Sequence, residues 1–413
     1  MTSTSPAPDG GNSPTLWTPS TIGGAKPRLS QAIEHIVKEM DRLGTSTQLL
    51  SRADCELVVA EIDSRSTRRA SEVEAIYRGG GCLWARTLAS NDPPDHRRFR
   101  SLVERIFTSA KVSAIESAVR ALAGELLDSW PEGIAFDGIS CFASPLPLRI
   151  IARELGVPEE DAGNFKRWSD AALATLSLHA TADDHLGWAR SGVEFQQYFG
   201  RLLDNPELQP EGSLLQLVAA QARRPEFAFS RAEQLSLLHT LMIAGHETAT
   251  ATLGEMLLVL AREPRWLAEM REGVQLHRRF IEEILRLAAP AQGLFRIAAR
   301  DTNLGGLSIP ARSVLSLRFA AANRDPGRFP EPATIRLDRP AVPPHLAFGA
   351  GIHFCIGAPL ARRELLVALE QLADRFERIE LAVPQESLRY TQSVTTRGLL
   401  ALPIVVTRRE AHA

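Results

Sequence analysis

The residue with the clearest capacity for chemistry is Cys355, which lies in a glycine-rich loop. Residues 348–357 read Phe-Gly-Ala-Gly-Ile-His-Phe-Cys-Ile-Gly, and a run with helical periodicity follows at once over 358–376. Glycine lets the backbone approach a bound group closely, because it has no side chain. A helix that begins just after a sulfur points free N–H groups and the positive end of its dipole at it, which favours the thiolate. This arrangement suits a thiolate that meets a large flat cofactor.

Simpler interpretations of this cysteine remain open from the residues alone. A lone cysteine is most often a small buried apolar side chain. A cysteine nucleophile normally takes its histidine from far along the chain, whereas His353 lies two residues away and nothing upstream supplies an oxyanion site. A zinc site needs more ligands at close spacing, and Cys55, Cys82 and Cys141 are scattered singly. Haem iron is a further alternative, since cysteine thiolate is one of the few protein ligands that hold it.

A group of polar residues interrupts the longest predicted helix. Ser230 and Glu233 form a capping box, and the helical pattern runs to about Arg262, before Pro264. Such a helix is roughly 48 Å long at a rise of about 1.5 Å per residue. Its centre, residues 244–250, reads Ala-Gly-His-Glu-Thr-Ala-Thr. Glycine costs up to ~1 kcal/mol against alanine in a helix, and glutamate is rarely buried without a partner. The segment is therefore either a polar surface patch or a place where the helix opens to hold a small ligand.

Helices are the main elements that must position these residues. Further helical patterns are expected at 30–43, 52–62, 94–106, 112–129, 145–155 and 159–176, and short strands at 304–309, 313–317 and 399–406. Asp92 is expected to cap the helix at 94–106. Residues 77–90 contain three consecutive glycines and are expected to be irregular. This pattern predicts a mainly α fold with a small β portion.

Two pairs of polar side chains have helical spacing. Glu283 and Arg286 are three residues apart, and His96 and Arg100 are four apart, so each pair shares one face of its helix. Taken alone, the first pair is typical of a surface salt bridge, worth about 0–1 kcal/mol. The second is typical of a solvated basic run.

Composition limits the classes of function. The formal net charge of the 413-residue chain is −2, so no overall field favours nucleic acid or a membrane surface. No apolar run approaches the ~20 residues needed to span a bilayer. Residues 1–27 are rich in Ser, Thr, Pro and Gly, which is typical of a disordered tail and not of a signal peptide. Four unpatterned cysteines predict a reducing compartment, so we expect a cytoplasmic protein. Length alone suggests two or three domains.

The cysteine loop resembles the haem-binding loop of the cytochrome P450 monooxygenases in their soluble bacterial form. The pattern Phe-Gly-x-Gly-x-His-x-Cys-x-Gly matches at every fixed position. Further segments similar to this family are Ala-Gly-x-Glu-Thr at 244–248, Glu-x-x-Arg at 283–286 and Asp-Pro-Pro-x-His-x-x-x-Arg at 92–100. The resemblance extends over 85–410 and is weak before that, because 44–51 is too short for the family's early hairpin. It implies a monomer with one mainly α domain of cytochrome P450 fold over 28–413.

The resemblance also implies a cofactor, haem b, and dioxygen as the co-substrate. Cys355 would be the axial ligand of the iron, with Phe348 packed beneath the ring and with Gly349 and Gly357 as fixed glycines of the loop. The implied partners of the haem propionates are His96, Arg100, Arg296 and His353.

Two further groups of residues receive roles from the family. In the long helix, Gly245 would make room for oxygen, Thr248 would hydrogen-bond it, and Glu247 would supply protons from solvent. Heterolytic cleavage of the O–O bond requires two protons in a pocket that is otherwise dry. The second group is structural: Glu283 and Arg286 would be buried and joined by Arg339.

The reaction implied is the insertion of one oxygen atom into a small, largely apolar organic molecule. The family positions that line the substrate pocket correspond to Trp84, Leu88, Leu176, Leu178, Ile243, Leu294, Phe295, Val394, Thr395 and Thr396. No flavin or nicotinamide segment is present, so electrons would come from a ferredoxin with its reductase. The arginines expected to dock such a partner are Arg97, Arg98, Arg362 and Arg363. A peroxide-driven peroxygenase and a non-catalytic haem protein are the alternatives, and Glu247 with Thr248 argues against both.

Overall fold

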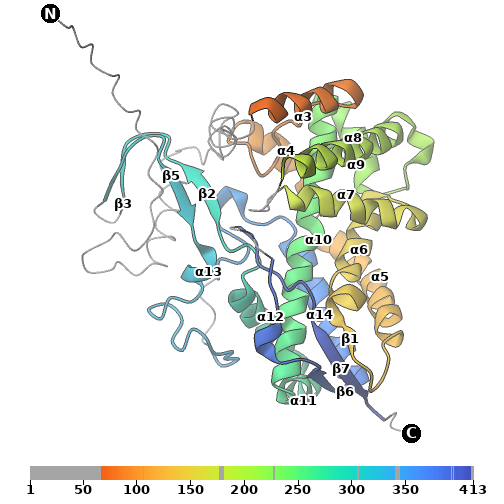
Figure 1. The fold of residues 1–413 in the computed structure, drawn as a ribbon, viewed down its shortest axis with the longest axis vertical. Coiled ribbons are helices and arrows are strands. Elements are labelled where there is room, and N and C mark those ends of the chain that lie inside the picture. Colours follow the sequence, from red (N-terminus) through yellow and green to blue (C-terminus); the bar gives the residue numbers. More distant parts are fainter. Residues whose placement is uncertain are drawn as a thin grey trace, which may run out of the picture.

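The 32-residue helix α10 (Arg231–Arg262) runs through the helical part of the molecule (Figure 1). It begins as predicted, because the Ser230 hydroxyl accepts a hydrogen bond from the Glu233 N–H at 3.2 Å and the Glu233 carboxylate accepts one from the Ser230 N–H at 2.8 Å. The computed structural model describes residues 67–105, 107–175, 181–226, 228–304, 307–339, 345–391, 393 and 395–410. The helices expected at 30–43 and 52–62, the tail at 1–27 and the short segment 44–51 lie outside these residues.

Two hydrophobic cores pack against opposite ends of α10. Leu238 and Leu241, near its start, belong to one core, and Leu253 and Leu257, near its end, belong to the other. Residues 244–252 belong to neither core, and this is where the polar residues of the helix stand. The polar residues of α10 therefore stand between the two cores and are not part of either.

Helices from both halves of the chain complete the two cores. The first core includes side chains of α4 (Asp95–Glu104), α6 (Pro145–Leu155), α7 (Ala162–Ala174), α8 (Ala182–Asp204) and α9 (Leu214–Ala222), with α3 (Thr67–Gly80) packed on α8. The second core includes side chains of α5 (Ser109–Asp128), η2 (Ile139–Ala143), α11 (Arg265–Glu272), α12 (Val274–Ala288) and α14 (Ala358–Arg375). Figure 1 shows α12 and α14 beside the lower half of α10, and α7, α8 and α9 beside its upper half.

Small antiparallel sheets complete the described fold. The strands of the first sheet are ordered β1 (Phe136–Asp137), β7 (Pro403–Arg408) and β6 (Phe376–Leu381). The two-stranded sheets pair β2 (Leu294–Ile297) with β5 (Val314–Leu317) and β3 (Thr302–Leu304) with β4 (Leu307–Ile309). The remaining short helices are η3 (Glu159–Asp161), η4 (Pro206–Leu208), α13 (Phe319–Ala322), η5 (Gly351–His353) and η6 (Gln385–Ser387).

The mainly α class is confirmed, but the helices α3, α8, α9 and α11 were not expected from local patterns. The helices at 145–155 and after the cysteine loop occur where expected. The prediction of an Asp92 cap is wrong, because α4 begins at Asp95 after Pro94 and no side chain caps it. Residues 77–80 were expected to be irregular but belong to α3. Among the described helices, none is long and apolar enough to cross a membrane.

Candidate active site

The loop that carries Cys355 has a backbone that glycine makes accessible. Gly349 and Gly351 adopt φ values of +68° and +71°, which residues with a side chain rarely adopt. The Cys355 N–H donates to the Phe348 carbonyl at 2.9 Å, which closes the loop directly before α14. Gly357 differs, because a Cβ added there would lie 3.9 Å from Cys355 Sγ, an ordinary contact distance. The backbone conformation thus explains the glycines at 349 and 351, whereas the packing around Gly357 would accommodate a Cβ.

Opposing influences act on the thiol of Cys355. Burial raises its pKa, while hydrogen bonds from the backbone N–H groups of Gly357 and Ala358 and the charges of Arg100 and Arg362 lower it. The N–H groups at the start of α14 thus favour the thiolate, as the sequence predicted. Burial outweighs this effect, so the net pKa lies above the ordinary value. An anionic sulfur here therefore needs an additional positive partner.

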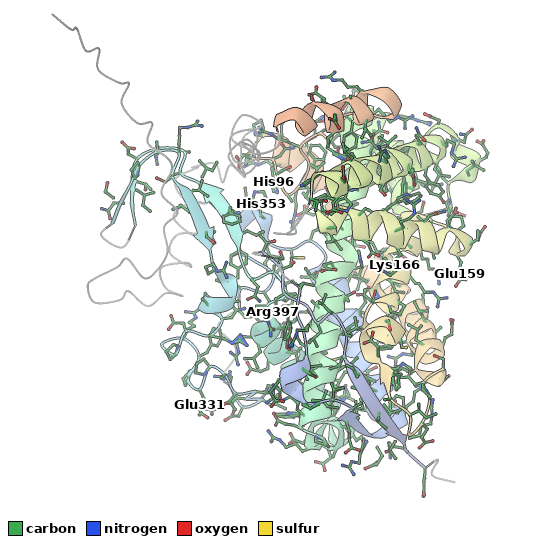
Figure 2. The ribbon with its side chains drawn as sticks, viewed as in Figure 1. His96, Glu159, Lys166, Glu331, His353 and Arg397 are labelled. Carbon is green, nitrogen blue, oxygen red and sulfur yellow. The ribbon has the colours of Figure 1, made fainter. Side chains whose placement is uncertain are left out.

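Four basic side chains come together at this loop: His96 and Arg100 from α4, His353 from η5, and Arg296 from β2. The rings of His96 and His353 lie 4.5 Å apart, and Figure 2 shows the two residues next to each other. Burial, followed by the charges of His96, Arg296 and Arg100, lowers the pKa of His353 to about 4. Arg100 is bonded to Glu104 at 2.7 Å and to the Phe354 carbonyl at 2.7 Å. The cluster therefore combines basic groups that repel one another.

Three nitrogens of this cluster are buried without a hydrogen-bond partner in the described structure: Nε2 of His96, Nε2 of His353 and Nε of Arg296. A buried polar group that makes no hydrogen bond costs about 1–3 kcal/mol. Burial lowers the pKa of Arg296, and Asp92 offsets only part of this effect. A ligand with two carboxylates would satisfy these nitrogens and balance their charge. The residues present thus fit the propionate edge of a haem.

The pair Glu283–Arg286 is buried, so the surface salt-bridge interpretation of the sequence is wrong. Arg286 donates to both carboxylate oxygens of Glu283, from Nε at 2.8 Å and from Nη2 at 2.9 Å, and its side chain is 0% exposed. Arg339 Nε and the Arg336 backbone N–H each donate to Glu283 Oε2 at 3.0 Å. Arg286 also donates to the carbonyl of Asn323 at 3.0 Å. The structure therefore brings the three expected residues together and ties α12 to the segment 323–339.

Glu247 lies half-buried on α10, on the side that faces α7. Burial, followed by the charge of Asp170, raises the pKa of the Glu247 carboxyl group, and Lys166 acts in the opposite direction. Lys166 and Asp170 form an exposed ion pair at 2.6 Å on α7, whose position Lys166 marks in Figure 2. Glu247 therefore has an electrostatic link to solvent-exposed charges and a raised affinity for a proton.

His246, beside Glu247, has a structural role that the sequence did not indicate. Its Nδ1 lies 3.0 Å from the Met242 carbonyl and its Nε2 lies 3.0 Å from the Ser169 hydroxyl. Because a carbonyl only accepts, Nδ1 carries the proton and Nε2 accepts from Ser169. This side chain fixes α10 against α7 at the polar centre.

Gly245 is required by the packing of α6 on α10. A Cβ at this position would lie 2.5 Å from Ile151 Cγ1 and 2.8 Å from Ile151 Cδ1, distances that real Cβ atoms do not show. The expectation that Gly245 makes room for oxygen stays a prediction. Thr248 is half-buried, and its carbonyl accepts a hydrogen bond from Thr252 Oγ1 at 2.7 Å. Thr250 Oγ1 is buried and has no partner in the described structure.

A cavity of about 280 Å³ opens between α3, α7, α8 and α10. Of the residues expected in the substrate pocket, Trp84 and Ile243 line it. Leu88 instead belongs to the first hydrophobic core, and Leu294 and Phe295 pair with Leu317 and Ser316 in the sheet β2–β5.

The other expected pocket residues do not extend this cavity. Thr395 and Thr396 are half-buried, and the Thr395 carbonyl accepts from the Gln292 N–H at 2.7 Å. Leu176, Leu178 and Val394 lie outside the described residues. The sequence missed the other aromatic residues of the cavity, which come from distant segments.

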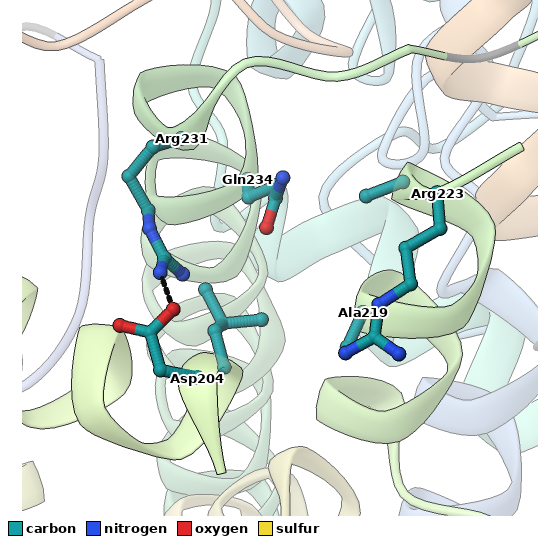
Figure 3. Close-up of a pocket in the computed structure, with 7 residues that line it drawn as sticks. Asp204, Ala219, Arg223, Arg231 and Gln234 are labelled. Atoms are coloured by element: carbon teal, nitrogen blue, oxygen red, sulfur yellow. Dashed lines mark hydrogen bonds and ion pairs between the residues drawn. The ribbon is translucent and has the colours of Figure 1, made fainter. Parts of the chain in front are cut away.

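A second cavity, of about 290 Å³, lies at the start of α10 (Figure 3). Its wall includes the ion pair between Arg231 and Asp204, with Gln234 and Arg223 on other sides. It is lined by none of the residues that the sequence analysis singled out.

Three of the four arginines expected to dock a redox partner are bonded to carboxylates. Arg98 pairs with Glu233, Arg362 Nε donates to Glu282 at 2.6 Å, and Arg363 Nη1 donates to Glu116 at 2.6 Å. Arg97 is exposed on α4. Ile352 and Phe354, in the cysteine loop, are 40% and 41% exposed. The surface beside Cys355 is therefore less cationic and more apolar than the sequence suggested.

Comparison with known proteins places the chain in a family. The family pattern described as cytochrome P450 matches residues 204–400. Mycinamicin IV hydroxylase/epoxidase of Micromonospora griseorubida is 35% identical over 321 residues, which are 77% of this chain and 79% of that protein. The chain belongs to the cytochrome P450 family. Vitamin D(3) 25-hydroxylase of Pseudonocardia autotrophica is 36% identical over 78% of each chain.

The fold agrees with this assignment. The solved structure of cytochrome P450 CYP109Q5 from Chondromyces apiculatus superposes with a TM-score of 0.70 at 36% identity, over 79% of this chain and 81% of that one. The fold is that of the cytochromes P450, and the chain is an oxidoreductase of the monooxygenase type. The family uses a haem with a thiolate ligand, and dioxygen.

Proposed function

We propose that this cytochrome P450 binds haem b through the thiolate of Cys355 and inserts one oxygen atom from dioxygen into a small, largely apolar organic molecule. The observation that carries this proposal is the set of unpartnered buried nitrogens at His96, His353 and Arg296. They lie beside the loop of Cys355, and two carboxylates of one flat cofactor would satisfy them. The bound haem would supply the activation of dioxygen.

The propionate partners would act by binding and orienting the cofactor. His96 and His353 are neutral near pH 7, because burial lowers the pKa of each imidazole. Each can therefore donate one hydrogen bond to a carboxylate, while Arg296 and Arg100 supply positive charge. Phe348 is the first residue of the cysteine loop, and the Arg362 guanidinium lies 4.6 Å from its ring centre. It would exclude water from the sulfur.

Proton supply would run from the α7 side of α10. Glu247 holds a proton more readily than an ordinary glutamate, since burial raises its pKa. Thr248, the next residue, would pass this proton on through its hydroxyl group. Because Lys166 and Asp170 are exposed, the carboxyl group of Glu247 can be reprotonated from solvent.

Electrons would come from a ferredoxin and its reductase, docked on the surface around Arg97, Ile352 and Phe354. The exposed cation is suited to attract an acidic partner. The exposed apolar side chains would exclude water from the contact. This surface is formed by the loop of Cys355 and the neighbouring helix α4.

Turnover of the haem-loaded protein tests the proposed reaction. A surrogate ferredoxin and reductase with NAD(P)H should support product formation, and hydrogen peroxide alone should support much less. Thr248→Ala should keep haem binding and substrate binding but divert reducing equivalents into peroxide. If peroxide alone matched the ferredoxin system, or if Thr248→Ala coupled electrons to product as the parent does, the proposed proton route would be wrong.

A further inference from the structure

The cavity between α3, α7, α8 and α10 is unusually aromatic for this chain. Three of the six tryptophans of the sequence line its space of about 280 Å³. No residue of the lining carries a full charge. The aromatic residues of its wall are Tyr77, Trp84, Trp168, Trp188, Phe195 and His239.

These rings are braced against one another. Trp84 Nε1 donates to the Tyr77 hydroxyl at 2.9 Å, and the His239 ring stacks on Trp84 with a centroid distance of 4.2 Å and an interplanar angle of 25°. Phe195 meets the His239 ring edge-on at 5.2 Å. A Cβ at Gly192 would lie 2.5 Å from the Tyr77 hydroxyl, so glycine allows α8 to approach α3 here. The walls are therefore preformed.

Size and charge restrict what this cavity can hold. An apolar cavity of about 150 Å³ accommodates benzene, so a space nearly twice as large suits two fused rings. A charged ligand would lose its hydration without meeting a counter-ion in the lining. The Arg167 guanidinium lies 5.9 Å from the Trp168 ring centre, but it is paired with Glu194, so these two charges balance each other outside the lining. A neutral planar group is the best fit.

His239 gives the cavity one polar contact. Burial lowers its pKa to about 4, so the ring is neutral at pH 7 and offers one donor and one acceptor. Its recorded contacts within the described chain are ring contacts with Trp84 and Phe195. The ring nitrogens are therefore available to a ligand.

We propose that this cavity anchors the substrate through a neutral group of two fused aromatic rings, whose hydroxyl or N–H group is hydrogen-bonded to His239. The inference rests on the proposed function, because the anchored rings belong to the molecule that is oxidised. His239, Ile243 and Glu247 follow one another at intervals of four on α10 and share a stripe. Thr248 stands on the neighbouring stripe, about 7.5 Å along the axis from Ile243. The oxidised carbon would thus lie in a part of the substrate that extends beyond the rings.

Equilibrium dialysis of the haem-loaded protein against 2-naphthol and naphthalene tests the anchor. His239→Phe keeps a stacked ring and removes the hydrogen bond, so it should weaken 2-naphthol binding by roughly three- to tenfold and change naphthalene binding by less than about twofold. Ala171→Trp should fill the cavity and abolish the binding of both compounds. Leu208→Trp, at an exposed position, is the matched control and should leave both affinities unchanged.

Several outcomes would overturn the inference. These are equal losses for both compounds in His239→Phe, unchanged binding in Ala171→Trp, or tighter binding of a naphthyl trimethylammonium cation than of 2-naphthol. Circular dichroism and the haem spectrum verify the folding of each variant, and His239→Phe alone decides if Ala171→Trp does not fold. Dialysis needs no electron donor, so the anchor and the proposed oxidation fail separately: absent binding rejects the anchor, and absent turnover with intact binding rejects the oxidation.

Discussion

Glu283→Gln should destabilise the protein strongly, because it removes the charge that balances Arg286. The carboxylate of Glu283 accepts four hydrogen bonds, two of them from Arg286 and one each from Arg339 and the Arg336 backbone. Arg286 is 0% exposed, so its guanidinium cannot turn to water. Removing one partner of a buried pair costs about 3–5 kcal/mol. Glutamine keeps the shape, so that the loss reports charge and hydrogen bonding.

The expected loss can be expressed as a shift in melting temperature. At about 2.1 cal/mol/K per residue, a chain of this length has an unfolding entropy of roughly 0.9 kcal/mol/K, which predicts a decrease in Tm of about 3–6 °C. Differential scanning calorimetry of the haem-loaded protein measures it. Arg336→Ala is the matched control, because its side chain is 33% exposed, pairs with exposed Glu331 and Asp338, and keeps the backbone bond to Glu283. It should leave the melting temperature almost unchanged, because exposed ion pairs contribute little to stability. If the Glu283→Gln protein had the same Tm as the Arg336→Ala protein, the reasoning would be refuted.

Three further predictions concern packing, pH and partner docking. Gly245→Ala should cost about 1–3 kcal/mol by overpacking. In calorimetry, the double variant Gly245→Ala/Ile151→Ala should lose less stability than the sum of the two single variants, whereas additive losses would contradict the contact. Burial raises the pKa of Glu282, but hydrogen bonds from His345 and Arg362 outweigh it and lower the pKa from 4.5 to about 2. The contribution of ionised Glu282 to folding stability is therefore present above pH 4.5 and is lost as the pH falls toward 2. Glu282→Gln should be less stable than the parent at pH 6 and equal to it near pH 2. A stability difference that stays the same at both pH values would contradict this. Arg97→Glu should slow reduction by the ferredoxin and weaken its salt dependence in stopped-flow measurements, and an effect no larger than that of exposed Arg224→Glu would remove Arg97 from the docking surface.

Local chemistry explains what could be predicted from the sequence. The start of α10 depends on Ser230 and Glu233, which are three residues apart, and the positive φ values at Gly349 and Gly351 occur where glycine stands. The strands β1, β2 and β6 were missed, and the single strand expected at 304–309 is instead two strands, β3 and β4, which pair with each other. Two- to six-residue strands leave little periodicity to detect.

The candidate site shows the same division between local and distant information. The Glu283–Arg286 pair was visible as a spacing, but its burial depends on the segment 323–339 and was not. Gly245 was visible as a glycine within a helix, but its steric neighbour Ile151 comes from another helix and was not. The carboxylates that neutralise Arg362 and Arg363 are likewise distant in sequence. His239 gave no signal at all, since its ring contacts come from α8 and from the segment after α3.

The absorbance spectrum of the reduced carbon monoxide complex tests the central claim most directly. The parent protein should show the red-shifted Soret band of a haem with a thiolate ligand, and Cys355→Ala should lose this band or lose the haem. Cys82→Ala and Cys141→Ala, which remove the other cysteines of the described chain, should keep it. A parent-like band in Cys355→Ala, or its loss in either control, would contradict the assignment of Cys355 as the iron ligand.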